Sequence, residues 1–196
     1  MQKNPTNNPI DVFKSWLEEA KNTSSIKEPT AMCVSTANKL GVPSSRMLLL
    51  KSVDDRGFVF YTNLTSKKGQ DLAENQNVSL CFYWADLGKQ VNIQGVAKPV
   101  SKKEADSYFA SRDIRSRVGA WASKQSQKMA GRLELMKRVA EYTAKFGVKV
   151  PRPPHWSGFR IEPKQIELWE EGAFRLHKRK MYKKLGTDWQ MDTLFP

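Results

Sequence analysis

The sequence is poor in the residues that build disulfide frameworks and metal centres. Its 196 residues include only two cysteines and two histidines. Two cysteines do not support the disulfide framework of a small secreted protein. The four residues stand far apart in the chain, at Cys33, Cys81, His155 and His177. Zinc ligands are normally more closely spaced, so we expect no metal site.

Long apolar segments and several common catalytic motifs are missing as well. No apolar run approaches the ~20 residues of a membrane-spanning helix, and the N-terminus, MQKNPTNNPIDVF, does not resemble a signal peptide. The chain contains no GxGxxG, GxxxxGK[ST] or GxSxG pattern, which argues against dinucleotide-binding, P-loop and hydrolase chemistry. We therefore expect a cytoplasmic protein with no membrane partner.

Positive charge, in contrast, is abundant. Lys and Arg number 33 against 20 Asp and Glu, which gives a net charge of +13. Such an excess favours phosphorylated ligands or polyanions, although ordinary proteins can also carry it. The segment Arg175–Lys184 concentrates cations without one acid. A nucleic-acid surface would need aromatic side chains for stacking, and only Tyr182 is local, so nucleic acid is the weaker alternative.

Short β-rich runs separated by turns dominate the chain. We expect strands at 31–37, 46–51, 57–62, 78–84, 90–100, 156–161, 165–169, 180–185 and 189–194, and helices at 9–21, 67–75, 101–111 and 131–146. Strands and helices do not alternate, which favours a mainly β antiparallel barrel with flanking helices over a doubly wound sheet. We expect one domain over 1–196, with about 1–8 flexible.

Two basic clusters are candidates for phosphate binding. Lys67 and Lys68 fall in the first turn of a helix that Ser66 is expected to cap. Cations there oppose the helix dipole, and a bound anion would compensate. Arg46 and Lys51 stand at the ends of the strand RMLLLK. Surface lysines and solvated strand ends remain the alternative interpretations.

Two further groups of polar residues have a suggestive spacing. Tyr108, Arg112 and Ser116 are four apart and would share one face if a helix continued through them. Such a group could hold a phosphate through a guanidinium fork and two hydroxyls. Arg175 and His177 would point the same way on a strand and could contact one ligand. A solvated basic face is the competing interpretation.

Longer strings in the chain resemble a known family. They include RMLLLK, GFVFYTN with SKKG, FYW followed by KQVNIQG, YFASR, GAWASKQS, PRPPHWSGFR and RLH. In register from about Asp11 to Pro196, the chain is similar to the pyridoxine (pyridoxamine) 5′-phosphate oxidases, which are FMN-binding split barrels. The resemblance implies a homodimer with FMN at the interface, each site held by both subunits.

The resemblance also implies roles for individual residues. FMN binding would involve Arg46, Met47, Leu48, Leu49, Leu50, Lys51, Tyr61, Thr62, Lys67, Lys68, Gln90, Gln125, Ser126, Trp169 and Arg179. The substrate would contact Lys51, Tyr108, Arg112, Ser116, Arg175, Leu176 and His177, the first four around its phosphate. Arg175 and His177 would be the catalytic residues, covering the pyridine ring and orienting the carbon that loses hydride.

The implied reaction oxidises pyridoxine or pyridoxamine 5′-phosphate to pyridoxal 5′-phosphate. Dioxygen accepts the electrons and becomes hydrogen peroxide, and the amine substrate also releases ammonia. This assigns redox chemistry to the cofactor and binding and orientation to the protein. The alternatives are a split-barrel reductase with FMN and another substrate, and a carrier of pyridoxal phosphate without catalysis.

The sequence departs from the family pattern in three places. Lys178 stands where the family's Arg-Leu-His-Asp-Arg has its acid, which removes a partner for Arg175 or Arg179. Lys67 replaces the Arg of Ser-Arg-Lys and cannot form a bidentate fork. The basic, Tyr-containing arm that commonly folds over the substrate is not found ahead of Asn8. The last departure predicts weaker substrate binding.

Overall fold

The fold was obtained as a computed structural model that describes residues 8–196. The expectation of a flexible segment at about 1–8 lies outside the described residues except for Asn8. The helices are α1 (Pro9–Asn22), α2 (Lys67–Glu74), α3 (Lys102–Ser111), α4 (Ile114–Ala122) and α5 (Arg132–Phe146). The strands are β1 (Ala31–Ala37), β2 (Pro43–Leu49), β3 (Ser52–Asp54), β4 (Gly57–Asn63), β5 (Asn77–Trp84), β6 (Lys89–Pro99), β7 (Trp156–Glu170), β8 (Lys178–Leu185) and β9 (Asp188–Leu194).

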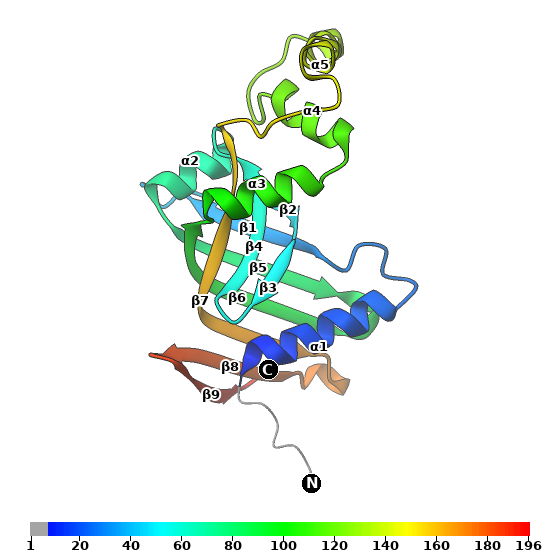
Figure 1. The fold of residues 1–196 in the computed structure, drawn as a ribbon. Helices are drawn as coiled ribbons and strands as arrows, with labels where there is room; N and C mark the ends of the chain where they lie inside the picture. Colours follow the sequence, from blue (N-terminus) through cyan, green and yellow to red (C-terminus); the bar gives the residue numbers. More distant parts are fainter. Residues whose placement is uncertain (1–7) are drawn as a thin grey trace.

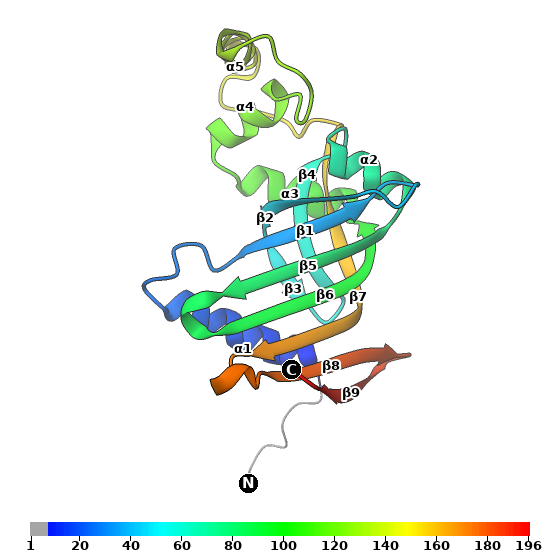
Figure 2. The ribbon, with the colours of Figure 1, turned by 180° about the vertical axis from the view of Figure 1, so that it is seen from behind.

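All the strands form one antiparallel sheet that curls into a split barrel. The strand order is β2-β1-β5-β6-β7-β4-β3, and β8 and β9 extend from a second pairing of β7. Figures 1 and 2 show the β8–β9 hairpin at one end of the molecule and helices α4 and α5 projecting from the other. The expected mainly β fold is confirmed. No helix within residues 8–196 is long and apolar enough to cross a membrane.

Strand β7 is a single long strand where the sequence predicted two, at 156–161 and 165–169. One edge of β7 pairs with β4 over Trp156–Ile161 and then with β8 over Gln165–Glu170. Pro163, which has no N–H, lies where the edge changes partner, so it interrupts no ladder on that side. On the other edge β6 continues throughout, with a register shift between Gln94 and Gly95.

Helix α1 fills the interior of the barrel with one apolar face. Ile10, Phe13 and Leu17 follow helical spacing and are buried. The ring of Phe13 packs edge-on against both Phe58 and Phe82, with centroids 4.9 Å apart in each pair. This contact fixes α1 against β4 and β5, and its buried face is the one that the apolar periodicity of the segment indicates.

Helices α3 to α5 form a smaller lobe beyond the sheet. Phe109, Val118, Val150 and Trp156 make a separate buried cluster there. The predicted helix at 131–146 is present as α5, but it buries none of its side chains completely. Leu133, on its apolar stripe, is 72% exposed. The lobe therefore contacts the barrel mainly through α3, α4 and the start of β7.

Candidate functional site

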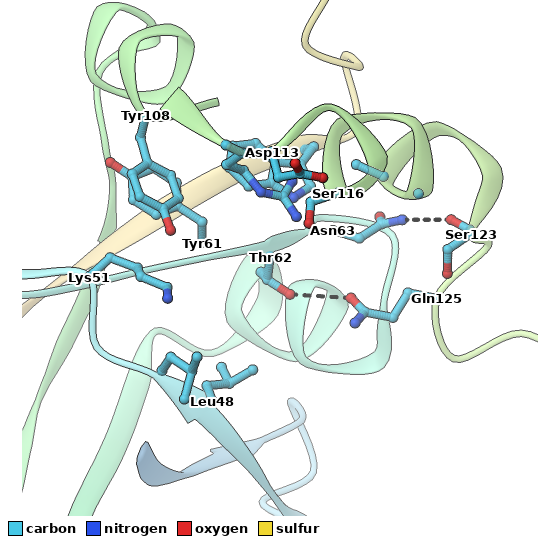
Figure 3. Close-up of a pocket in the computed structure, with 15 residues that line it drawn as sticks. Leu48, Lys51, Tyr61, Thr62, Asn63, Tyr108, Asp113, Ser116, Ser123 and Gln125 are labelled. Atoms are coloured by element: carbon cyan, nitrogen blue, oxygen red, sulfur yellow. Dashed lines mark hydrogen bonds between the residues drawn. The ribbon is translucent and has the colours of Figure 1, made fainter. Parts of the chain in front are cut away.

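A cavity of about 620 Å³ opens between the sheet and the helical lobe. It lies where β4 ends, beneath the corner between α3 and α4 and beside the segment that follows α4 (Figure 3). Its lining comprises Leu48, Leu49, Lys51, Tyr61, Thr62, Asn63, Tyr108, Arg112, Asp113, Ser116, Gly119, Ala120, Ser123, Gln125 and Trp156. Residues from five separate stretches of the sequence thus meet at one place.

Three aromatic rings form one wall of this cavity. Tyr61 stacks on Tyr108 with centroids 4.0 Å apart and on Trp156 with centroids 5.3 Å apart. Tyr61 can lie flat because its strand neighbour is Gly158, where a Cβ would fall 2.6 Å from the tyrosine ring. Burial raises the pKa of the Tyr61 hydroxyl. The wall is therefore mainly apolar.

The predicted grouping of Tyr108, Arg112 and Ser116 on one helix face is wrong, although all three reach the cavity. Helix α3 ends at Ser111, and Arg112 follows with extended backbone angles, φ −74° and ψ 150°. Asp113 then caps α4 by accepting a hydrogen bond from the Arg115 N–H at 2.8 Å. A corner between two helices, rather than one continuous helix, brings the three side chains together.

Arg112 is a partly buried cation with an unused donor. Its guanidinium lies over the ring of Trp156, 4.9 Å from the centroid, and 5.6 Å from that of Phe109. The Nη1 atom is buried and has no hydrogen-bond partner among residues 8–196. Burial lowers the pKa of this guanidinium. A buried donor without a partner costs free energy, and an anion in the cavity would satisfy it.

Lys68 is a buried cation that does not line the cavity but contacts Thr62, which does. Ser66 caps α2 as predicted, and Lys68 in the first turn is only 5% exposed. Its Nζ lies 3.3 Å from the Thr62 hydroxyl and 3.4 Å from that of Ser66, and it forms no ion pair with a carboxylate of residues 8–196. Burial and the nearby Arg46 lower the pKa of Lys68. This arrangement fits the phosphate of FMN, which would supply the missing negative charge.

Lys67 and Arg46, also predicted to bind FMN, already have partners. Lys67 forms an ion pair with Asp71 at 3.1 Å. Arg46 donates from Nη1 to the Thr36 hydroxyl at 2.9 Å, and its Nη2 lies 4.0 Å from Asp71. Neither residue lines the cavity, and in this they resemble Lys68.

Strand β2 differs from its predicted limits of 46–51. It spans Pro43–Leu49, because Pro43, Ser44 and Ser45 pair with the far end of β1. Lys51 therefore lies beyond the strand, where its side chain enters the cavity (Figure 3). Leu48 and Leu49 line the cavity as well, whereas Met47 and Leu50 do not.

The segment after α4 closes the cavity through contacts with β4. The Thr62 hydroxyl donates to the Gln125 side chain at 3.4 Å, and the Asn63 amide donates to the Ser123 carbonyl at 3.5 Å (Figure 3). Ser126 lies just outside, in neighbouring hollows. Sequence reasoning missed several lining residues, namely Asn63, Asp113, Gly119, Ala120, Ser123 and Trp156. All of these except Asp113 belong to the quoted strings GFVFYTN, GAWASKQS and PRPPHWSGFR, which were the available signal.

The remaining predicted residues lie at the opposite end of β7. Gln90 pairs with Trp169, which in turn pairs with Arg179 across the strands. Arg179 donates to Glu167 at 2.6 Å and to the Phe195 carbonyl at 3.1 Å. The hydrogen bond with Glu167 raises the pKa of Arg179. Glu167 thus serves as the acidic partner that the substitution at position 178 was expected to remove.

Arg175 and His177 are not on a strand, contrary to the prediction. They belong to a tight turn between β7 and β8, and β8 begins only at Lys178. A Cβ at Gly172 would fall 2.0 Å from the Leu176 carbonyl oxygen, so the turn closes tightly on itself. The Gly172 N–H donates to His177 Nδ1 at 3.3 Å.

The predicted site residues therefore form two groups that do not meet within one protomer. One surrounds the cavity at the start of β7, and the other surrounds the turn after its end (Figure 1). A strand of 15 residues spans roughly 50 Å when straight. The bend in β7 shortens this span, but the two groups remain at opposite ends of the molecule.

The chain is similar to known proteins over nearly its whole length. Residues 18–146 match the family described as "Pyridoxamine 5′-phosphate oxidase". Residues 156–196 match a second model, "Pyridoxine 5′-phosphate oxidase C-terminal dimerisation region". The two models together cover the cavity, the long strand and the turn.

Two curated relatives and one solved structure illustrate the similarity. The pyridoxine/pyridoxamine 5′-phosphate oxidase of Maricaulis maris is 51% identical, over 96% of this chain and 86% of the relative. That of Agrobacterium fabrum is 47% identical, over 97% and 93%. The crystal structure of PhzG from Burkholderia lata with tetrahydrophenazine-1-carboxylic acid superposes with a TM-score of 0.93 at 37% identity, covering 98% of this chain and 95% of that one.

Proposed function

Since the chain belongs to the pyridoxamine 5′-phosphate oxidase family, which consists of FMN-dependent oxidases, we propose that it oxidises pyridoxine and pyridoxamine 5′-phosphate to pyridoxal 5′-phosphate. Dioxygen is the electron acceptor and hydrogen peroxide the product, with ammonia released from the amine substrate. The proposal concerns the substrate and the residues that act on it.

One observation carries this proposal: two cations without carboxylate partners among residues 8–196 lie at or beside the same cavity. Arg112 is partly buried and lines it, and Lys68 is buried next to it, in contact with the lining residue Thr62. FMN and the pyridoxine phosphates each carry one phosphate monoester, so an enzyme that binds both needs two such positions. The aromatic wall between them suits flat ligands.

The residues around Arg112 would anchor the substrate through its phosphate. Lys51, Tyr108 and Ser116 line the cavity together with Arg112 and offer an ammonium and two hydroxyls. An anchor at the phosphate fixes the pyridine ring and thereby the exocyclic carbon to be oxidised. These residues contribute orientation and charge, which is the share of catalysis that the protein supplies when a cofactor does the redox chemistry.

FMN would be held by Lys68 at its phosphate, with Thr62 and Gln125 alongside. When bound, FMN would supply the redox chemistry, which is to accept a hydride from the substrate carbon and to return the electrons to dioxygen. The helix α2 N-terminus adds backbone N–H groups near Lys68, a favourable position for phosphate.

The turn that carries Arg175 and His177 would reach the cavity of a second copy of the chain. Within one protomer the turn and the cavity are at opposite ends of β7, and residues 156–196 match the family's dimerisation region. We therefore infer a homodimer in which each site combines the cavity of one protomer with the partner's turn, Gln90, Trp169 and Arg179. His177 accepts a hydrogen bond at Nδ1, so Nε2 is the ring nitrogen that remains for a substrate oxygen.

An anaerobic absorbance titration tests the proposed reaction. The FMN-reconstituted protein is mixed with pyridoxine 5′-phosphate in the absence of oxygen, and the flavin band is expected to bleach. Admission of air should restore the band and yield peroxide in proportion to the substrate added. A bound flavin that stays oxidised with both phosphorylated substrates would refute the proposal.

The similarity to PhzG defines the most informative comparison substrate. The PhzG crystal structure contains tetrahydrophenazine-1-carboxylic acid, a tricyclic carboxylate without a phosphate. Bleaching by that compound but not by pyridoxine 5′-phosphate would replace the proposed substrate with an aromatic carboxylate. We expect instead that the protein oxidises the phosphorylated substrate and that replacement of Arg112 lowers this turnover.

A further inference from the structure

We infer that Phe174 is a substrate-contacting specificity residue, whose ring covers the substrate in the partner protomer's cavity. The inference rests on the proposed function, because it takes the turn after β7 to complete the partner's site. It concerns a residue that neither composition nor spacing had singled out. Phe174 directly precedes Arg175 in that turn.

The backbone of the turn holds Phe174 in an unfavourable conformation. Phe174 has φ 56° and Arg175 has φ 64°, so two consecutive residues with side chains are left-handed. Left-handed angles disfavour every residue except glycine and, to a smaller extent, asparagine and aspartate. Gly or Asn would therefore stabilise the turn more than Phe does. Strain of this kind is concentrated at functional sites.

The turn is closed by its own contacts and needs no flexible loop. The Leu176 N–H donates to the Ala173 carbonyl at 3.0 Å, and the His177 N–H donates to the Arg175 carbonyl at 3.0 Å. The His177 ring packs against Trp169, with centroids 4.6 Å apart. These contacts fix the backbone from which the Phe174 side chain projects before any ligand binds, which lowers the entropic cost of ordering the turn around substrate.

Phe174 contributes nothing to the packing of its own protomer. Its side chain is 94% exposed, next to Arg175 and to Leu176, which is 67% exposed. An apolar ring at this place would be stabilised by a partner surface or a ligand. The aromatic wall of Tyr61, Tyr108 and Trp156 offers a flat ligand one apolar face. Phe174 would add apolar cover where the ligand faces water.

An asparagine variant at position 174 distinguishes the effect of the phenyl ring from the effect of the backbone conformation. Phe174→Asn keeps a residue that tolerates the left-handed angle and deletes the phenyl group. We expect the KM for pyridoxine 5′-phosphate to rise about tenfold, the value for partial burial of a phenyl ring. The kcat and the FMN dissociation constant should be unchanged. The melting temperature should stay the same or rise. Phe174→Tyr should restore the KM.

Leu40→Ala is the matched control, because Leu40 is 79% exposed at the tip of the β1–β2 hairpin and has no role in the site. A KM within twofold of wild type in Phe174→Asn would overturn the inference, provided that wild type oxidises the substrate and Arg175→Ala does not. Absence of substrate oxidation by wild type would instead refute the proposed function. The two failures are therefore distinguishable.

A labelling experiment tests the contact without any turnover. Phe174→Cys is made in a Cys33→Ser, Cys81→Ser background, and its reaction with a maleimide is timed in the FMN-bound dimer. Pyridoxal 5′-phosphate should slow labelling at least tenfold, while an equivalent Leu40→Cys protein should label at an unchanged rate. Equal rates at position 174 with and without pyridoxal 5′-phosphate would overturn the inference.

Discussion

Lys68 shows how a buried charge can be retained at the expense of apo-protein stability. The residue is 5% exposed, and within residues 8–196 its ammonium hydrogen-bonds only to hydroxyl groups. A buried ammonium without an anion is costly, so the folded protein is poised to gain free energy when a phosphate arrives. Its neighbour Lys67 has a carboxylate partner and lacks this property.

Replacement of Lys68 should therefore affect cofactor affinity and apo stability in opposite directions. We expect Lys68→Met to weaken FMN binding about 10- to 100-fold, the value of a charge-assisted phosphate contact. The melting temperature of the apo protein should stay the same or rise. Flavin fluorescence titration and thermal unfolding measure the two effects. Lys67→Met, in the same turn, should change FMN affinity far less.

The lowered pKa of Lys68 also predicts a pH dependence. Burial lowers this pKa below its ordinary 10.5, so the charge is lost at a lower pH than for an exposed lysine. FMN affinity should then decrease as the pH rises toward 10.5, and Lys68→Arg should abolish the decrease. Apo stability should rise over the same window, since only the unfolded chain still holds the proton. A wild-type affinity profile that stays identical to that of Lys68→Arg up to pH 10.5 would contradict the first expectation.

Arg175 and His177 should separate turnover from cofactor binding. We expect Arg175→Ala and His177→Ala to lower kcat/KM for pyridoxine 5′-phosphate by at least tenfold while the dimer keeps its FMN, because both side chains are assigned to the substrate. Steady-state kinetics and the flavin absorbance of the purified variants provide the measurement. Colourless variants with normal thermal unfolding would show that the two residues hold the cofactor instead.

At the scale of elements, β7 shows what the sequence could and could not predict. The patterns predict its two apolar halves as separate strands, at 156–161 and 165–169, whereas the structure continues the strand through Pro163. The continuity depends on which strands flank β7, and pairing partners are not encoded in the periodicity of one segment. The corner at Arg112 is a similar case, because helical spacing could not reveal that α3 ends at Ser111 and that α4 turns back over the cavity.

Gly95 supports the bend of β7 and tolerates no side chain. A Cβ at Gly95 would lie 2.3 Å from the Glu162 carbonyl oxygen, at the register shift opposite Pro163. We expect Gly95→Ala to lower the free energy of unfolding by about 2 kcal/mol or more, since backbone must move. Urea unfolding of the apo protein checks this. Gly119→Ala in α4, with nothing within 4 Å of its Cβ, should be neutral or stabilising by up to ~1 kcal/mol.

For the whole molecule, most of the fold and much of the site could be predicted, for different reasons. The antiparallel barrel followed from local patterns, which also located most helices and strands. The site residues followed from the resemblance to the family, because residues such as Thr62 and Gln125 approach each other only after folding. The separation of the predicted site into two groups became visible only with the course of β7.

A shared site predicts that two inactive proteins can restore activity together. Arg112→Ala damages the cavity and Arg175→Ala damages the turn, so each homodimer should be nearly inactive. A mixed dimer has one site with both defects and one with none. Unfolding and refolding an equimolar mixture should give about a quarter of wild-type activity, from random pairing in a two-fold dimer. Activity no greater than the average of the two separate variants would indicate that each protomer builds its own site.

The course of β7 also has a consequence for how the protein can change over generations. In the proposed homodimer, a single gene encodes both halves of every site, yet no polypeptide uses its own two halves together. Each mutation is therefore expressed in both sites of the dimer. A compensating change in the turn can rescue the cavity only through a neighbouring molecule. Selection consequently acts on the dimer, so a change in the turn is retained only if it stays compatible with the cavity of a second copy.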